Sequence, residues 1–165
     1  MKNGFTLIEI LVVLGILIVL SVVALPIYKR YMLIAKTSEA KMNIGAIMTC
    51  EDSYAQLNDL YLTEAYYPLG MPGPEKREWN IDSSGHFKDI GFAPAGKVYY
   101  SYGVDSGNKC NNPEAANPNH GSVPATAGTD ISVIAKGDLD GDGIFGYFCT
   151  TDTRYPEIKR IIGDF

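Results

Sequence analysis

The sequence predicts an α+β protein in which one long N-terminal helix packs against a small antiparallel β-sheet head. Three observations predict this fold. An almost wholly apolar run covers residues 5–25, an apolar repeat of three and four residues follows it, and short strand candidates between Gly, Pro and Asp appear only later. The 165 residues are enough for one domain with a modest core.

The apolar run from Phe5 to Leu25 contains a single charged residue, Glu9. As a helix the run would be about 31 Å long, which is close to the thickness of a bilayer's hydrocarbon core. A signal peptide has a shorter apolar region, of roughly 7–15 residues. An ordinary membrane anchor would not carry an unpaired carboxylate, which costs on the order of 3 kcal/mol in that position. The run therefore needs an explanation that includes Glu9.

Pro26 closes the apolar run, and we expect a kink there or local unwinding, because proline lacks an N–H and clashes with the preceding turn. Beyond it, a helical face is predicted by apolar residues at steps of three and four: Ala40, Ile44, Ile47, Cys50, Tyr54, Leu57 and Tyr61. We expect a hydrophobic half at 5–26, an amphipathic half at 27–61 that ends near Asn58, and a β head at 62–165.

The head contains three strand candidates, at Lys97–Val104, Asp130–Lys136 and Ile144–Cys149. They predict a sheet of three or four antiparallel strands. Residues 105–130 are polar and show no period, so they are expected to form a long, variable surface loop.

An acidic segment, DLDGDG, separates the last two strand candidates. Its residues match positions one, three, five and six of a calcium-binding loop: Asp138, Asp140, Asp142 and Gly143. The twelfth position is a cysteine and not the usual glutamate. The alternative is a tight Asp/Gly turn that needs positive φ and side-chain caps. We favour the turn, keep calcium as the alternative, and expect no other cofactor.

Charge and motifs argue against two classes of function. The formal net charge is -5 and no basic stripe is present, so nucleic acid is not an expected partner. The sequence contains no Ser-His-Asp order, HExxH, CxxC or phosphate-binding glycine loop, so we do not expect an enzyme.

The segment Gly4-Phe5-Thr6-Leu7-Ile8-Glu9 resembles the GFTLIE signature of type IV pilins and related pseudopilins. The resemblance implies a type IV pilin fold, a leader peptide at 1–4, cleavage between Gly4 and Phe5 by a membrane peptidase, and N-methylation of Phe5. Glu9 would then be the fifth residue of the mature chain. Because a carboxylate in an apolar medium needs an opposite charge, Glu9 is expected to pair with the new N-terminus of a neighbouring subunit.

The head adds a second, shorter resemblance to some bacterial major pilins, in the passage IGFAPAG at residues 90–96. Together the two imply the structural subunit of a bacterial type IV pilus, a helical homopolymer that serves adhesion, twitching motility or DNA uptake. The precursor would lie in the inner membrane, meet the prepilin peptidase and the pilus assembly machinery, and leave as an extracellular filament.

Two alternatives to the pilus subunit stay open. A type II secretion pseudopilin shares the same first segment. A single-pass membrane-anchored binding protein is the other alternative, but it leaves Gly4 and Glu9 unexplained.

The resemblance also places the head in an oxidising compartment, where disulfides persist. A disulfide between Cys110 and Cys149 is the favoured pairing of the three cysteines. Pairing with Cys50 remains the alternative, because sequence alone does not fix connectivity.

Overall fold

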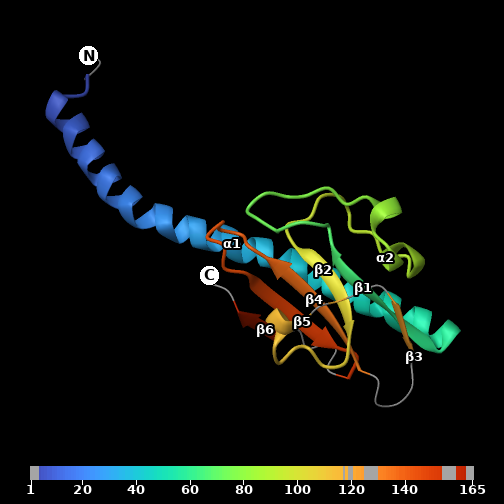
Figure 1. Cartoon of the computed structure of the whole chain (residues 1–165). Helices are drawn as coiled ribbons and strands as arrows, with labels where there is room; N and C mark the ends of the chain where they lie inside the picture. The colour runs from blue at the N-terminus through green and yellow to red at the C-terminus, as the bar shows by residue number, and fades with distance from the viewer. Residues whose placement is uncertain (1–3, 117, 119–120, 125–129, 154–158, 163–165) are drawn as a thin grey trace. The chain divides into compact units, whose positions relative to one another are not determined.

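The structure is a computed structural model, and it describes residues 4–116, 118, 121–124, 130–153 and 159–162. The chain divides into two compact units, and the boundary lies inside one long helix, between Ala35 and Lys36 (Figure 1). The first unit is the apolar part of that helix. The second unit contains the rest of the helix together with the described strands.

Helix α1 runs from Leu7 to Asn58, a length of 52 residues, and continues through Pro26. Local unwinding therefore does not occur at this proline, and a kink there stays a prediction. The large apolar side chains from Leu7 to Leu25 have exposed fractions of 46–84%. The described residues of the chain leave this part of α1 uncovered.

The part of α1 that belongs to the second unit buries one face, with these residues: Thr37, Ala40, Ile44, Ile47, Met48, Glu51 and Ala55. Their spacing confirms an amphipathic helix, but the predicted face is wrong in its last two turns. Leu57 is 84% exposed and Cys50 is only half-buried, whereas Glu51 and Ala55 turn inward. The apolar repeat predicts the wrong face in these turns because one of the inward positions, Glu51, is polar.

A strand that the sequence reading missed begins directly after the helix. Asp59 adopts a left-handed backbone conformation, with φ at 57°, and β1 covers Leu60–Tyr67. The predicted end of the helix near Asn58 is confirmed, but the bound of the helical half at residue 61 is too late, because Tyr61 lies in a strand. The alternation of LYLTEAYY is a strand pattern, but Tyr61 also continued the helical repeat and was assigned to the helix.

The described strands form one sheet in the order β3-β1-β2-β4-β5-β6, with antiparallel neighbours. The six strands are β1, β2 (Ser101–Ser106), β3 (Gly121–Pro124), β4 (Ile131–Gly137), β5 (Gly146–Thr151) and β6 (Lys159–Ile162). The predicted strands correspond to β2, β4 and β5. The α+β fold with an antiparallel sheet is confirmed, but the sheet is larger than the expected three or four strands.

The predicted loop at 105–130 contains part of the sheet. Strand β2 extends to Ser106, a short 3-10 helix covers Pro113–Ala115, and β3 pairs with β1 through Tyr61 and Val123. Residues 117, 119–120 and 125–129 of the predicted loop lie outside the described residues. Strand β3 has four residues, with Gly at one end and Pro at the other. It is too short to show an alternation of apolar and polar residues, so its sequence is typical of a loop.

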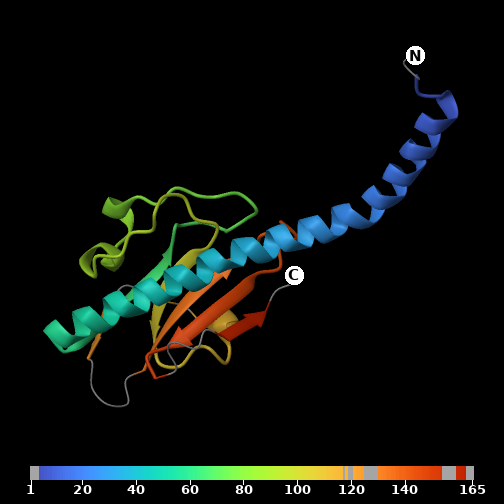
Figure 2. The same cartoon turned by 180° about the vertical axis from the view of Figure 1, so that it is seen from behind.

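The connection between β1 and β2 packs by its aromatic residues. It carries a 3-10 turn at Ile81–Ser83 and the short helix α2 at His86–Asp89. The ring of Trp79 lies 4.9 Å from that of Tyr67, measured between ring centroids, and 5.4 Å from that of Phe87. Figure 2 shows the second part of α1 running across the sheet within the same unit. Aromatic burial thus holds a connection with little regular structure.

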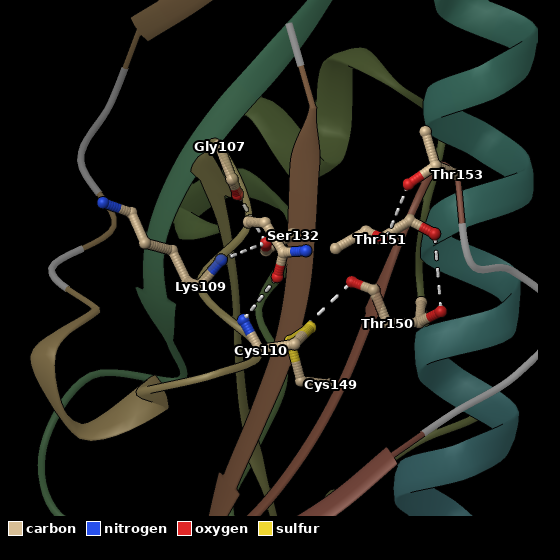
Figure 3. The surroundings of a disulfide bond; sticks show 9 residues. Gly107, Lys109, Cys110, Ser132, Cys149, Thr150, Thr151 and Thr153 are labelled. Atoms are coloured by element: carbon tan, nitrogen blue, oxygen red, sulfur yellow. Dashed lines mark hydrogen bonds between the residues drawn. A yellow bond between two sulfur atoms is a disulfide. The ribbon is translucent and has the colours of Figure 1, made fainter. Parts of the chain in front are cut away.

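The predicted disulfide joins Cys110 and Cys149, whose Cα atoms are 5.5 Å apart and whose side chains are fully buried (Figure 3). Cys50 is free. The Ser132 hydroxyl of β4 donates to the Gly107 carbonyl at 2.6 Å and accepts from the Lys109 N–H at 2.8 Å. The segment before Cys110 is therefore held against β4 by hydrogen bonds as well as by the covalent link.

A buried carboxyl group joins the helix to the sheet. Glu51 is 1% exposed, and its Oε2 accepts the Leu62 backbone N–H of β1 at 3.0 Å. Burial, with a further contribution from the Asp52 charge, raises the pKa of Glu51 to about 8, although the Leu62 N–H opposes the shift. The neutral acid is therefore the form that the folded head favours.

We predict that this carboxyl group makes the head less stable as pH rises. The unfolded side chain ionises near 4.5, so between about 4.5 and about 8 the folded state binds the extra proton. The free energy of unfolding should fall through this window by up to about 1.4 kcal/mol per pH unit. Denaturant unfolding of the detergent-solubilised chain at several pH values measures this slope.

Glu51→Gln keeps an acceptor for Leu62 and should flatten that slope, whereas Glu75→Gln, at an exposed position, should leave it unchanged. Equal slopes in the wild type and in Glu51→Gln would contradict the assignment.

Removal of the disulfide should lower the free energy of unfolding by about 4 kcal/mol, because the link closes a loop across a sequence separation of 39 residues. The variant is Cys110→Ser with Cys149→Ser, and denaturant unfolding measures the loss. Cys50→Ser is the matched control and should cost less than about 1 kcal/mol at its half-buried site. A loss no larger than that of the control would disprove a stabilising link.

Candidate functional site

The start of α1 is built by a side-chain cap. Gly4, Phe5 and Thr6 precede the helix, and the Thr6 hydroxyl accepts the Glu9 backbone N–H at 3.3 Å. Thr followed three residues later by Glu is the capping-box pattern, in which a hydroxyl satisfies a free N–H of the first turn. The pattern is present in the segment TLIE, so this cap could be predicted from the sequence. The cap fixes where the helix begins and places Glu9 in its first turn.

Glu9 is the only charged residue of an otherwise apolar surface. The other hydroxyl group of the run, that of Ser21, donates to the Leu17 carbonyl at 2.7 Å and is satisfied within the helix. Glu9 lies exposed in the first turn, where the positive end of the helix dipole favours a carboxylate. The helix therefore presents one anionic group on a face suited to lipid or to other apolar helices.

Three of the predicted site residues are close in sequence at the start of the chain: Gly4, Phe5 and Glu9. Phe5 is 79% exposed, and its nitrogen is an uncharged amide in the uncleaved chain. A positive partner for Glu9 at this position therefore requires cleavage. By length and composition, α1 is also a helix that could cross a membrane.

The acidic segment forms the turn between β4 and β5. Asp138 is 7% exposed, and its two oxygens accept the backbone N–H groups of Gly141, at 2.7 Å, and Gly143, at 3.1 Å. Both glycines adopt left-handed conformations, with φ at 80° and 86°. The predicted features of a self-capped Asp/Gly turn, positive φ and side-chain caps, are therefore present.

The same turn brings three carboxylates together. One oxygen from each of Asp138, Asp140 and Asp142 lies within 4.8 Å of the others. Desolvation, with the charge of Asp142 adding to it, raises the pKa of Asp140 above its usual range. The twelfth position of the calcium-loop pattern, Cys149, is occupied in the disulfide. The donor set is thus compatible with a cation but lacks the bidentate carboxylate of a complete calcium loop.

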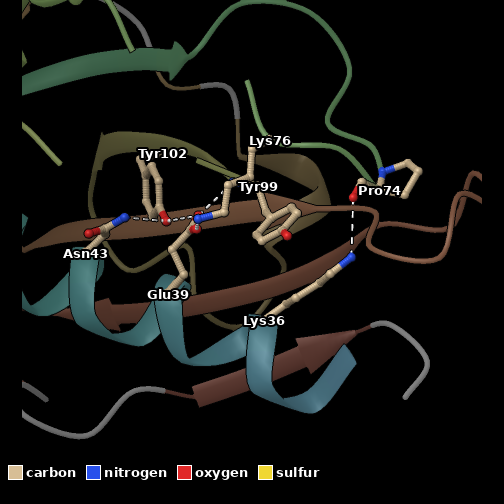
Figure 4. Close-up of polar contacts among 7 residues, drawn as sticks. All are labelled: Lys36, Glu39, Asn43, Pro74, Lys76, Tyr99 and Tyr102. Carbon is tan, nitrogen blue, oxygen red and sulfur yellow. Dashed lines mark hydrogen bonds and ion pairs between the residues drawn. The ribbon is translucent and has the colours of Figure 1, made fainter. Parts of the chain in front are cut away.

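A polar network that was not predicted joins α1 to the connection between β1 and β2 and to β2 itself (Figure 4). Glu39 accepts the Tyr99 backbone N–H at 2.7 Å and forms an ion pair with Lys76 at 3.3 Å. Asn43, one turn further along α1, donates to the Tyr102 hydroxyl at 2.8 Å. The only available signal was the spacing of polar residues beside the buried face, which is also typical of a solvated surface.

Among known protein families, one matches the N-terminal segment of the chain. The family "Prokaryotic N-terminal methylation motif" matches residues 1–25. The chain is 30% identical over 105 residues to the type IV major pilin protein PilA of Myxococcus xanthus, a match that covers 64% of this chain and 38% of the relative. It is 35% identical over 72 residues to the type IV major pilin protein PilE1 of Neisseria gonorrhoeae, covering 44% and 31%.

A further relative is matched over more of its length. The chain is 34% identical over 103 residues to the type II secretion system core protein G of Pseudomonas aeruginosa, covering 59% of this chain and 71% of the relative. The chain spans less than two-fifths of the length of the pilins above. No solved structure matches it significantly. The methylation motif, these shared segments and the helix-and-sheet fold together show that the chain belongs to the family of type IV pilins and the related core proteins of type II secretion.

Proposed function

We propose that this protein is the structural subunit of a type IV pilus, which polymerises through α1 after cleavage between Gly4 and Phe5 and N-methylation of Phe5. The observation that carries the proposal is the uncovered apolar surface of α1 from Leu7 to Leu25, with Glu9 in its first turn. Such a surface is stable only in lipid or against other apolar helices. A bundle of identical helices provides the second environment.

Glu9 gives that bundle its register. Cleavage turns the Phe5 amide into an ammonium group, and Glu9 of one subunit pairs with this group on a neighbour. An unpaired charge in an apolar bundle costs several kcal/mol, so helices shifted along the axis are disfavoured. The role is structural, and we assign no catalytic step and no nucleic-acid contact to the subunit.

The route to the filament follows from the two environments of α1. The precursor lies in the inner membrane with α1 as its spanning segment, where the prepilin peptidase and the assembly machinery act on it. The assembled filament is extracellular and serves adhesion, twitching motility or DNA uptake. The buried disulfide suits a head outside the reducing cytoplasm.

A second candidate function is that of a type II secretion pseudopilin. The match that covers 71% of the secretion system core protein G favours it, since the pilin matches cover less of their relatives. Shearing filaments from the producing cells and reading the N-terminus by mass spectrometry separates the two. Abundant sheared fibres that contain N-methyl-Phe5 support the pilus subunit. Their absence, with the mature chain kept in the cell envelope, favours the pseudopilin.

We predict that Glu9→Gln lowers the filament yield at least about tenfold, because the neighbour's ammonium group loses its partner in an apolar bundle. Sheared fibres measure the yield, and mass spectrometry verifies that N-methyl-Phe5 still forms. Thr6→Ala is the control, since it removes the helix cap and leaves the charge. A processed Glu9→Gln chain that assembles like the wild type would disprove the role in register.

We also predict that the acidic turn binds no calcium up to millimolar concentration. Its most buried carboxylate already accepts two N–H groups, and the twelfth ligand position is a disulfide cysteine. Calorimetric titration of the detergent-solubilised chain tests this. Saturable heat that disappears in Asp140→Asn and Asp142→Asn would instead establish the metal site.

A further inference from the structure

The first half of β1 belongs to a two-stranded ribbon at one edge of the sheet. Residues 60–63 pair with residues 121–124 of β3, which is the outermost strand on that side (Figure 1). Among the described residues, the pairs between β1 and β2 begin only at Glu64, and their register is irregular. A two-stranded ribbon is at best marginally stable by itself in water. The position of this ribbon therefore depends on what it packs against.

One buried side chain of α1 binds the backbone of the ribbon. Glu51 is 1% exposed, and its Oε2 accepts the Leu62 N–H at 3.0 Å. Leu62 is buried as well. A single residue, Asp59 in its left-handed conformation, separates the end of α1 from the start of β1. Glu51 therefore acts at the junction where the helix ends and the edge of the sheet begins.

The titratable groups around Glu51 provide no positive charge. They are Cys50 and Asp52 of α1, Tyr61 of β1, and Asp152 after β5, whose charge acts on Asp52 and Tyr61. One oxygen of Asp152 is buried and has no hydrogen-bond partner in the described chain. The ion pairs between described residues involve other carboxylates. An ionised Glu51 would therefore be buried beside like charges without a counter-ion.

These surroundings favour the protonated form of the acids at the junction. Burial raises the pKa of Glu51, and burial together with the Asp152 charge raises the pKa of Asp52, although the Tyr61 hydroxyl opposes the second shift. If the ribbon leaves the helix, the Glu51 carboxyl group reaches water and its pKa returns towards the ordinary value. The open form thus releases a proton, and a rise in pH favours it.

We propose that residues 60–63 and β3 form a proton-controlled clasp, which is docked on α1 while Glu51 is protonated and detaches locally when Glu51 ionises. The rest of the sheet stays folded, because β2, β4 and β5 pair along their lengths and the disulfide joins β5 to the segment after β2.

The clasp goes beyond the proposed function, because it lies within the head and would work in a pilus subunit and in a pseudopilin alike. Its detachment uncovers the buried side of the last turns of α1, at Glu51 and Ala55, and leaves the β1 edge of the sheet unpaired. The proton therefore controls access to this part of the head through a local opening and not through global unfolding.

Hydrogen exchange of the detergent-solubilised full chain, followed by NMR between pH 5 and pH 9, tests the clasp. Protection factors, which correct for the intrinsic pH dependence of exchange, are compared at Leu62 and at Ile134. Ile134 lies in the middle of β4 between two paired strands, so it reports global unfolding. A local opening exposes little surface, so low urea concentrations should leave the protection of Leu62 almost unchanged while they lower that of Ile134.

We expect the protection factor of Leu62 at low urea to fall by up to about tenfold per pH unit below about pH 8 and to level off above it. Glu51→Gln keeps an acceptor but removes the titrating proton, so it should abolish this dependence. Glu39→Gln is the matched control, because Glu39 also accepts a backbone N–H of the head, that of Tyr99. It should keep the wild-type dependence at Leu62.

Two results would overturn the proposal. Equal urea dependence at Leu62 and Ile134 would show that the ribbon opens only together with the whole head. A wild-type pH dependence at Leu62 in Glu51→Gln would show that another group controls the opening. The urea comparison needs only the wild-type chain, so it decides the question of local opening even if Glu51→Gln does not fold.

Discussion

The structure depends on one constraint: the apolar surface of α1 between Leu7 and Leu25 is not covered by the described residues of its own chain. An apolar surface of this size is unfavourable in water. Its stability therefore depends on apolar surroundings that these residues do not provide. Lipid and other copies of the helix are the two environments that match it. The proposed life of the protein, first in a membrane and then in a filament, is a passage between these two environments.

The second part of the same helix solves the opposite problem, because it must bind a head that is mostly sheet. Apolar packing on one face of the helix provides most of the contact with the head, but two acidic side chains determine where the head meets the helix. Glu39 and Glu51 each accept a backbone N–H from the head, at Tyr99 and Leu62. Backbone donors that would otherwise be buried unpaired thereby find acceptors on the helix.

The fold class and the disulfide could be predicted from sequence because they rest on strong local patterns and on a specific motif. Strand β1 could not be predicted, because Tyr61 fits both a helical repeat and an alternating strand. The left-handed conformation occurs at Asp59 and not at a glycine, so the sequence does not indicate that the helix ends there. The burial of Glu51 was not predicted either, because a helical repeat of apolar residues does not mark a buried carboxyl group. Its burial depends on the Leu62 N–H, a contact made only after the chain reverses direction. For the acidic turn, the Asp/Gly pattern predicted the backbone conformation but not whether a metal ion binds there.

The position of Glu9 is suited to both stages of the proposed passage. Before cleavage, the Thr6 cap places Glu9 in the first turn of α1, where the helix dipole provides roughly half a positive charge. That field lowers the cost of the carboxylate while the helix lies in lipid. In the proposed maturation, cleavage creates a full positive charge four residues earlier, which a neighbouring subunit would offer to Glu9. In this proposal the stronger partner exists only after processing, so the same residue would tolerate the membrane and would favour assembly of mature subunits over precursors.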